Sequence, residues 1–390
     1  MTGSGPAIPS AIRLSAFPLA LAMTALTMAA SAGQTVDSSA GPLSATVLAE
    51  GLEHPWALAF LPDGRFLVTE RPGRLRVVAD GALGPPIEGV PEVVARGQGG
   101  LLDLALAPDF ERSGRLFLSY AEPAEAAGQP GGAGTAVMAA RLLLEGDGGR
   151  LEDQQVIFRM NRFDDSSRHF GSRIVVGADG NLFVTLGERG TMERAQDPTD
   201  LAGGVVRIGP DGSVPEDNPR PEGWAPEFWS IGHRNPQGAT LRDSDGALFT
   251  VEHGARGGDE VNKPEAGGNY GWPVITYGMD YSGLPIGEGQ EKAGMEQPLH
   301  YWDPSISPSG LDFYEGELMP AWDGDLVLGG LSGEVLVRLD MEGDRVVGEE
   351  RLFERQLGRV RDVRVGGDGA IYLLTDAADG KLIRVAPEGR

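Results

Sequence analysis

The seven residues 232–238 read Gly-His-Arg-Asn-Pro-Gln-Gly and place four polar side chains between two apolar runs. Buried polar groups are costly unless each finds a partner. A segment of this kind therefore either holds a polar ligand or takes part in a shared hydrogen-bond network. The alternative is a loop whose side chains only cap the neighbouring backbone. This segment alone leaves both interpretations open.

A second polar segment, Arg168-His169-Phe170-Gly171-Ser172-Arg173, directly precedes a short apolar run. The chain has no cysteine and only five histidines, so few side chains can exchange a proton near neutral pH. We therefore expect His169 to stand at the start of a strand and to act as a general base. The alternative is a histidine whose ring is satisfied by backbone groups.

Two glycine-rich segments carry polar groups beside a predicted strand. Residues 252–260 read Glu-His-Gly-Ala-Arg-Gly-Gly-Asp-Glu, and residues 97–102 read Gly-Gln-Gly-Gly-Leu-Leu. Glycine lets backbone groups approach a ligand closely, and carbonyl and carboxylate oxygens are the ligands that calcium prefers. The acidic spacing is not that of an EF-hand. Ordinary turns remain the alternative for both segments.

Arg359 and Arg361 are two residues apart in a predicted strand and so share one face of it. Paired guanidinium groups bind carboxylates in bidentate geometry. Pairing with Asp362 and with other acids of the chain is the alternative.

The bulk composition excludes several classes of function. The 390 residues carry a formal charge of −24, which disfavours nucleic acid and anionic membranes as partners. The absence of cysteine excludes thiol catalysis, disulfides and thiolate metal sites, so any metal must be bound by oxygen or imidazole.

The first 32 residues have the features of an export signal. Arg13 precedes a mostly apolar run, and residues 30–32 read Ala-Ser-Ala, a small-x-small cleavage site. The run is short for a membrane anchor and contains Pro18. We expect residues 1–32 to be a cleaved signal peptide, residues 33–390 to be a single domain, and the mature protein to be periplasmic without membrane insertion.

A repeated unit must position the polar segments. Apolar strands flank an Asp-Gly turn, or a degenerate form of it, six times along the chain, and Asp-Gly between apolar runs is a strong hairpin signal. The turns are at residues 63–64, 109–110, 179–180, 245–246, 323–324 and 368–369. Such repetition predicts an all-β, six-bladed propeller rather than a sandwich. Residues 121–134 and 210–224 are its clearest insertions, and we expect long loops at the mouth that builds the site.

Taken in order, these segments resemble the soluble PQQ-dependent glucose/sorbosone dehydrogenases, and most closely their aldose sugar dehydrogenase branch. The matching segments are Gly-Gln-Gly-Gly-Leu-Leu, His-Phe-Gly-Ser-Arg, Gly-His-Arg-Asn-Pro-Gln-Gly, Glu-His-Gly-x-Arg-Gly-Gly-Asp-Glu, Asn-Tyr-Gly-Trp-Pro and Arg-x-Arg-Asp-Val. The resemblance extends from about residue 52 to residue 385. It implies a propeller that binds pyrroloquinoline quinone (PQQ) and Ca²⁺ at one mouth and oxidises the C1 hydroxyl of aldose sugars to lactones.

The resemblance also implies roles for individual residues. His169 becomes the base that takes the hydroxyl proton while hydride passes to PQQ, and Arg234 stabilises charge on the quinone. The remaining cofactor contacts are Gln98, Asn235, His253, Arg359 and Arg361. The carbonyl groups of Gly254 and Ala255 bind calcium, and Glu260 and Tyr270 match a second calcium region of some relatives. His233 and Gln237 are expected to brace the turn.

Three departures from the family pattern affect these expectations. Ser332 stands where relatives often carry a lysine that grips the cofactor, Ala255 replaces a proline, and Arg168 replaces an acid before the histidine. Two other functions remain open, a calcium-dependent propeller lactonase and a non-catalytic binding propeller. The preferred sugar, the electron acceptor, and whether the protein is a monomer or a homodimer are left undetermined.

Overall fold

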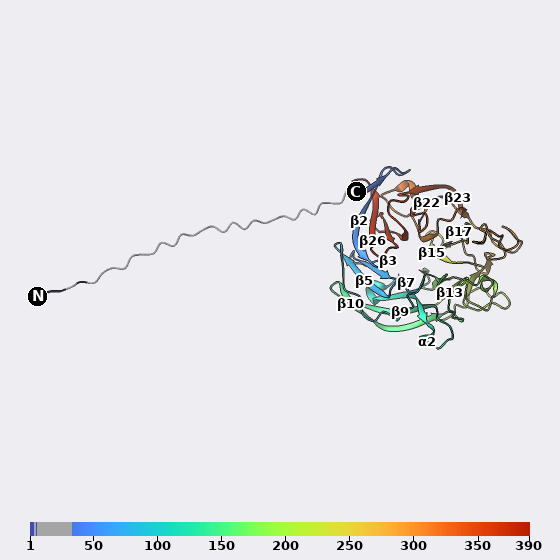
Figure 1. The fold of residues 1–390 in the computed structure, drawn as a ribbon, viewed down its shortest axis with the longest axis horizontal. Helices are drawn as coiled ribbons and strands as arrows, with labels where there is room; N and C mark the ends of the chain where they lie inside the picture. Colours follow the sequence, from blue (N-terminus) through green and yellow to red (C-terminus); the bar gives the residue numbers. More distant parts are fainter. Residues whose placement is uncertain (4, 6–32) are drawn as a thin grey trace. The chain divides into compact units, whose positions relative to one another are not determined.

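The computed structural model describes residues 1–3, 5 and 33–390 (Figure 1). The predicted signal peptide therefore lies almost wholly outside the described residues. Within the described part of the chain, no helix is long and apolar enough to span a bilayer.

Residues 33–390 form six antiparallel sheets, one of which gains a short parallel strand. The first three sheets take the strands in chain order. Sheet 1 contains β3 (Pro55–Phe60), β4 (Phe66–Glu70), β5 (Arg74–Ala79) and β6 (Ala82–Leu83). Sheet 2 contains β7 (Leu101–Leu106), β8 (Arg115–Pro123), β9 (Ala133–Glu145) and β10 (Gly148–Arg159). Sheet 3 contains β11 (Gly171–Val176), β12 (Leu182–Leu186), β13 (Gly204–Ile208), β14 (Phe228–Ile231) and the parallel β18 (Gly268–Asn269).

The other three sheets complete the fold. Sheet 4 contains β15 (Pro236–Leu241), β16 (Leu248–Glu252), β17 (Asp259–Asn262) and β19 (His300–Trp302). Sheet 5 contains β20 (Pro308–Phe313), β21 (Leu326–Gly330), β22 (Val335–Glu342) and β23 (Arg345–Leu352). Sheet 6 contains β24 (Val360–Val365), β25 (Ile371–Thr375), β26 (Gly380–Pro387), β2 (Leu43–Leu52) and β1 (Gln34–Val36). The described helices are short: α1 (Phe110–Ser113), α2 (Ala124–Ala127), η1 (Met192–Gln196) and η2 (Pro320–Trp322).

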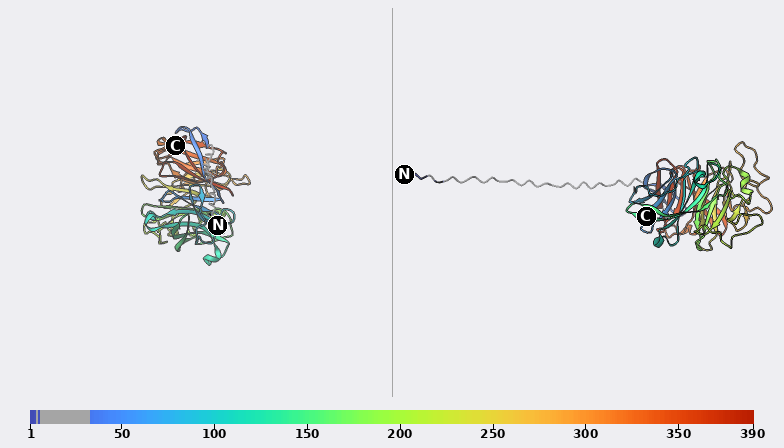
Figure 2. Two further views of the ribbon diagram at one scale, coloured as in Figure 1. Left: turned by 90° about the vertical axis from the view of Figure 1, so that its left-hand side faces the viewer. Right: turned by 90° about the horizontal axis from the view of Figure 1, so that it is seen from below.

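The first strands of the six sheets surround one axis. They contact one another in the closed order β3, β7, β11, β15, β20, β24 and back to β3. The sheets radiate outward from these strands (Figures 1 and 2). The predicted six-bladed β-propeller is confirmed.

All six turns, whether Asp-Gly or degenerate, lie between the first and second strands of a sheet, as the sequence predicted. Chain direction alternates within a sheet, so the turns gather at one end of the propeller. The starts of the first strands and the ends of the second strands therefore gather at the other end, which we call the mouth. Insertion 121–134 comprises the end of the second strand β8, α2 and the start of β9, and belongs to the mouth, whereas insertion 210–224 follows a third strand, β13, and belongs to the opposite end.

The ring closes between the two ends of the chain. β2 pairs antiparallel with β26, from Leu43 opposite Pro387 to Leu52 opposite Gly380. The sequence analysis did not predict this closure, because no repeated unit marks β2 as part of the last sheet.

Apolar side chains fill the spaces between neighbouring sheets, but the axis itself is polar. The side chain of Arg173, on β11, is 1% exposed and lies 3.0 Å from Asp103 of β7 and 2.9 Å from Asp362 of β24. The two carboxylates also accept the backbone N–H groups of Ile174 and Leu58, at 2.7 and 2.9 Å. A buried charge network therefore joins four of the first strands beneath the mouth.

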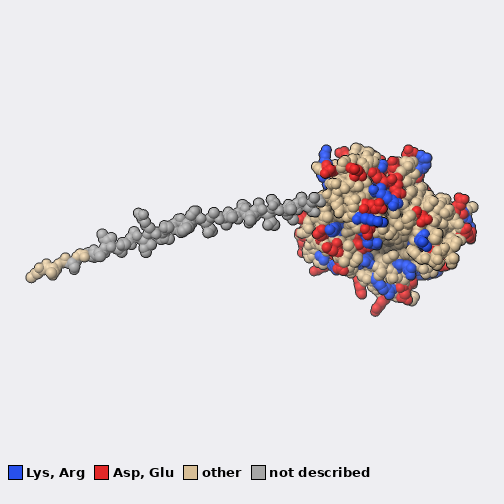
Figure 3. Space-filling view, turned by 45° about the horizontal axis from the view of Figure 1, so that its top comes forward, with Lys and Arg blue, Asp and Glu red and all other residues tan. Residues whose placement is uncertain are grey.

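The outer surface carries both signs of charge. Figure 3 shows Lys and Arg side chains interspersed among Asp and Glu on the face that it presents. The net charge of −24 is therefore not gathered into one acidic field on that face.

Candidate active site

A cavity of about 360 Å³ opens at the mouth, and every sheet contributes to its wall. Eight of the predicted site residues line it. These are Gln98, His169, Arg234, His253, Gly254, Ala255, Arg359 and Arg361. The structure thus brings together segments that are far apart in the sequence.

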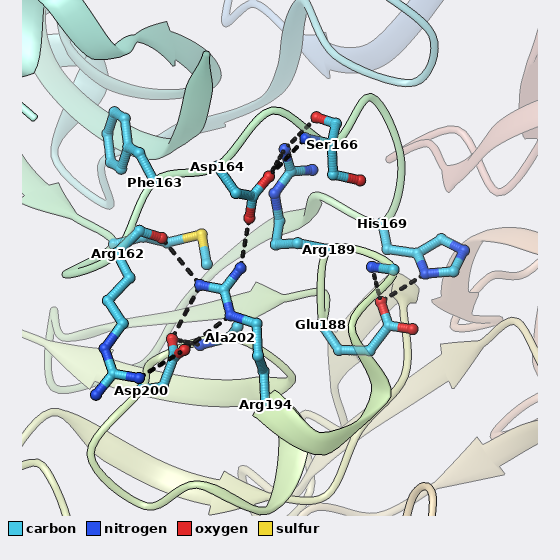
Figure 4. Close-up of polar contacts among 12 residues, drawn as sticks. Arg162, Phe163, Asp164, Ser166, His169, Glu188, Arg189, Arg194, Asp200 and Ala202 are labelled. Carbon is cyan, nitrogen blue, oxygen red and sulfur yellow. Dashed lines mark hydrogen bonds and ion pairs between the residues drawn. The ribbon is translucent and has the colours of Figure 1, made fainter. Parts of the chain in front are cut away.

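His169 and Glu188 form a hydrogen-bonded pair at this cavity (Figure 4). The Nδ1 of His169 lies 2.5 Å from the Oε2 of Glu188, which also accepts the N–H of Gly190 at 2.6 Å. The buried carboxylate can only accept a hydrogen bond when ionised, so the neutral ring carries its proton on Nδ1. The Nε2 lone pair of His169 is then available to a hydroxyl group in the cavity.

Electrostatics keep His169 neutral. Burial lowers the pKa of His169 below its ordinary value, and the charges of Arg234 and Arg168 act in the same direction, against the opposing effect of Glu188. A neutral imidazole at neutral pH is the state that a general base requires.

Backbone geometry near His169 is constrained on both sides. His169 has a φ of +56°, a left-handed conformation that is strained for a residue with a side chain. Its N–H donates to the Oε1 of Gln98 at 2.7 Å, so Gln98 holds the histidine as well as lining the cavity. Gly187 lies against the His169 backbone. A Cβ at Gly187 would be 2.2 Å from the His169 carbonyl oxygen, so only glycine fits there.

Four guanidinium groups and one carboxylate make the cavity electropositive. The arginines are Arg71, Arg234, Arg359 and Arg361, and the carboxylate is Asp376. Although burial opposes ionisation, Arg361, His54 and Arg359 hold the pKa of Asp376 at about 2. Burial lowers the pKa of Arg361 to about 10, so Arg361 stays protonated at neutral pH.

Arg361 is held more firmly than Arg359. The Nη1 of Arg361 donates to the Oε1 of Gln237 at 2.9 Å, and its Nη2 lies 3.4 Å from Asp376. Arg359 is half-exposed and lies 3.6 Å from the same carboxylate. The prediction for Gln237 was incomplete, because this side chain braces the turn and also lines the cavity.

Asn235 lies beneath the cavity and does not line it. Its side chain is fully buried, and its Oδ1 accepts the N–H of Gly171 at 3.2 Å and the Nε2 of Gln237 at 3.3 Å. Its neighbour His233 is bonded to Glu252 and Ser230, each at 2.9 Å, and braces the turn as predicted.

Glu260 and Tyr270 face a smaller, separate cavity, which they share with Arg234, Glu252 and His253. Burial and the neighbouring Glu252 raise the pKa of Glu260. The Tyr270 hydroxyl donates to the Lys263 carbonyl and accepts the N–H of Glu265, so this hydroxyl is already engaged. The described residues contain no group of three or more acidic or imidazole side chains that could hold a metal.

Around Gly254 the wall is organised by Asp259. The Asp259 carboxylate accepts the N–H groups of Gly254, Ile306 and Ser307, each at 2.8 Å. Ser332 is exposed and bonds to Ser307 at 2.8 Å, and it does not line the cavity. His253 donates its Nε2–H to the Pro308 carbonyl, and burial lowers its pKa to about 3, so it is neutral.

Sequence reasoning missed three charged residues that contact this site, Arg71, Glu188 and Asp376, and left Tyr281 open between a substrate contact and a surface position. Arg71, Glu188 and Asp376 come one or two positions after a second strand, as His253 does. A search for charged residues at those strand ends would have found them. Tyr281 lies in a long loop and carries no comparable signal.

The chain is similar to known proteins over most of its length. The family model described as Glucose / Sorbosone dehydrogenase matches residues 52–384. The aldose sugar dehydrogenase YliI of Escherichia coli is 44% identical over 347 residues, which cover 87% of this chain and 92% of that protein.

Solved structures agree with this relationship. The apo-form of the Escherichia coli aldose sugar dehydrogenase is 43% identical with a TM-score of 0.84, covering 89% of this chain and all of that one. The PQQ-bound form of an aldose sugar dehydrogenase from Streptomyces coelicolor is 28% identical with a TM-score of 0.73, covering 90% and 100% of the two chains. The chain therefore belongs to the glucose/sorbosone dehydrogenase family of enzymes.

Proposed function

We propose that this protein is a PQQ- and calcium-dependent dehydrogenase that oxidises the C1 hydroxyl of aldose sugars to lactones. The observation that carries the proposal is the presence, in one cavity, of a neutral histidine base and a cluster of guanidinium groups. The relatives named aldose sugar dehydrogenase support the substrate class.

The donor set of the cavity fits an anionic, polycarboxylate cofactor such as PQQ. Arg71, Arg359 and Arg361 would bind carboxylates, because a guanidinium group donates in bidentate geometry. The Nε of Arg234, which lines the cavity, is buried without a hydrogen-bond partner and would gain one from a polar group there; the Nδ2 of Asn235 is also unpartnered, although Asn235 does not line the cavity.

Calcium would take oxygen ligands in the same wall. The carbonyl groups of Gly254 and Ala255 would serve the cofactor site, and Glu260 and Tyr270 remain a proposal for a second ion. Bound PQQ would accept two electrons from C1, and calcium would act as a Lewis acid.

The protein's own groups perform the remaining chemistry. The Nε2 of His169 takes the proton of the C1 hydroxyl, and Glu188 stabilises the imidazolium that forms. Arg234 supplies positive charge to the cavity wall and disfavours a protonated His169 before the reaction. Because His169 is almost completely buried, water has little access to the base.

Reconstitution tests the proposal. Apo-protein is titrated with PQQ in the presence of Ca²⁺, binding is followed by absorbance, and dye reduction is then measured with a panel of aldoses. We expect sugar-dependent dye reduction by the wild type, and the His169→Gln variant should bind PQQ normally but lack turnover. Binding without turnover on any aldose would indicate a binding propeller, and lactone hydrolysis without PQQ would indicate a lactonase.

We also propose that residues 1–32 are a signal peptide and that the enzyme acts in the periplasm, where it passes electrons to an acceptor that remains unidentified. The export features of residues 1–32 support this proposal. Amino-terminal sequencing of the exported protein should begin at Gly33.

A further inference from the structure

The backbone that carries His169 has no regular secondary structure. Residues 161–170 lie between β10 and β11 without joining a sheet ladder, apart from one bridge between Asp164 and Ala133. His169 and Ser172 both have positive φ, +56° and +90°. Such conformations persist only when surrounding groups over-determine them. Side chains from elsewhere must therefore hold this segment.

Arg189 contacts the segment at every second residue, and Figure 4 shows its contacts with Asp164 and Ser166. Its Nη1 donates to the Arg168 carbonyl at 2.5 Å, and its Nη2 donates to the Ser166 carbonyl at 2.6 Å and to Asp164 at 3.2 Å. Its Cζ lies 3.5 Å from the centre of the Phe170 ring. One guanidinium group thus fixes both chain neighbours of His169.

Arg189 is itself immobilised. Its side chain is 0% exposed, and its own φ is +64°. It follows Glu188 directly, and Glu188 is anchored by its N–H to the Arg234 carbonyl at 3.0 Å. Two consecutive residues after β12 therefore act on the same histidine, since Glu188 bonds the ring, and Arg189 bonds the backbone before His169 and stacks on the Phe170 ring after it.

We propose that Arg189 is a positioning residue for the proposed base: it holds residues 164–170 so that the imidazole of His169 stays against Glu188 with Nε2 toward the cavity. The placement of His169 by Arg189 is independent of the proposed function, and only the expected effect on kcat rests on that function.

Arg194 provides a matched comparison. It also binds Asp164, donates to the Arg162 carbonyl at 2.9 Å, and pairs with Asp200 at 2.7 Å. It makes no hydrogen bond to residues 166–170, although it is anchored in the same network. Loss of Arg194 should therefore destabilise the loop without displacing His169.

The kinetic test compares Arg189→Lys with Arg194→Lys in the PQQ-reconstituted protein. A lysine keeps the charge beside Asp164, but one ammonium group cannot reach three acceptors and stack on Phe170. We expect R189K to lower kcat about 10- to 100-fold, with little change in the PQQ dissociation constant or the sugar KM. R194K should keep a near-normal kcat at a comparable loss of thermal stability.

A second readout uses the apo-protein and does not depend on activity. The protein has five histidines, so ¹⁵N-histidine labelling gives few signals, and His169→Gln identifies the signal of His169. In R189K the ring should become more solvated, so the pKa of His169 should rise toward its ordinary value, while R194K leaves it unchanged. This result is obtained even if the protein oxidises no sugar.

Two outcomes would overturn the proposal. One is an R189K protein whose His169 signal titrates as in the wild type. The other is an equal loss of kcat in R189K and R194K, which would mean that Arg189 is merely structural. If R189K does not fold, Asp164→Ala removes one of the three acceptors of Arg189 and should give a smaller upward shift of the His169 pKa; an unshifted signal in that variant would also refute the proposal.

Discussion

At the scale of single residues, the carboxylate of Glu188 determines which nitrogen of His169 faces the cavity. It binds Nδ1 at 2.5 Å and so leaves Nε2 to accept a proton. The two influences on the pKa of His169 are opposed, since burial lowers it and Glu188 raises it. The basicity and the orientation of the ring therefore depend on the same partner.

Replacing Glu188 by Gln separates these two contributions. The amide no longer stabilises imidazolium, so the pKa of His169 should fall further below its ordinary value, and the acid limb of the kcat/KM profile should move to lower pH. The plateau value of kcat should fall about 100-fold, because the amide oxygen can still accept the Nδ1–H and hold the ring but no longer stabilises the imidazolium that forms. The pH–rate profile of dye reduction measures both. An acid limb that moves to higher pH would contradict this role for Glu188.

The sequence predicted the site residues that stand at the starts of first strands, but not the residues that bind to them. His169, Arg234 and Gln98 were predicted from polar segments that precede apolar runs, and Arg359 and Arg361 from their spacing, although Arg359 lies just before β24. Glu188 lies in Leu186-Gly187-Glu188, which looks like an ordinary strand end, and only the fold brings it to His169, 19 residues away. The pairing follows from the register of the β11–β12 hairpin, in which Gly171 lies opposite Leu186, and the sequence alone does not display that register.

At the scale of elements, the first strands are joined at the axis by charge rather than by apolar packing. Arg173 of β11 lies between Asp103 of β7 and Asp362 of β24, and all three are almost completely buried. A buried pair adds little net stability, but breaking it leaves uncompensated charge. The network therefore makes each sheet's position depend on the others.

Replacement of Arg173 by Met tests this dependence. It removes the cation that lies between the two buried carboxylates and leaves them only the longer contacts to Arg364, at 3.5 and 3.3 Å, so the free energy of unfolding should fall by about 3–5 kcal/mol. Chemical denaturation measures the loss. Arg112→Met is the control, because the Arg112 side chain is 84% exposed on α1 and its pairing with Asp109 contributes little. An R173M variant as stable as R112M would show that the network is dispensable.

The repeated turn made the six sheets predictable, but not their edges. Each Asp-Gly turn marked a first and a second strand, because a tight turn needs particular residues at fixed positions. β1, β6 and β18 are two or three residues long, and pairing with a neighbour rather than local propensity creates them. The sequence also placed the insertion at residues 210–224 at the mouth, and this was wrong for the same reason. The end of the propeller at which a loop lies depends on how many strands of its sheet come before it.

At the scale of the whole molecule, ring closure depends on ten residues near the amino terminus of the described domain. β2 buries Leu43, Ala45, Ala49 and Leu52 against the rest of sheet 6 and covers the edge of β26. Without it, β26 would present an unpaired edge, which promotes aggregation.

Truncation distinguishes β2 from its outer neighbour. A chain beginning at Glu53 lacks both strands and should lose its cooperative unfolding transition, as followed by circular dichroism. A chain beginning at Asp37 lacks only β1, whose residues are exposed or half-buried, and should unfold nearly as the mature protein does. Cooperative unfolding of the shorter chain with an unchanged midpoint would mean that sheet 6 is complete without β2.

The pairing of β2 with β26 also governs the order of events in folding. These partners are separated by more than 300 residues, so sheet 6 cannot form until nearly the entire chain has left the ribosome or the export channel. Contacts of such long sequence separation slow folding, because the entropy of a large loop must be lost first. The same pairing places the two ends of the domain side by side, so a circular permutant opened at the Asp245–Gly246 turn would make the β2–β26 pairing local and move the late closure to β15 and β16.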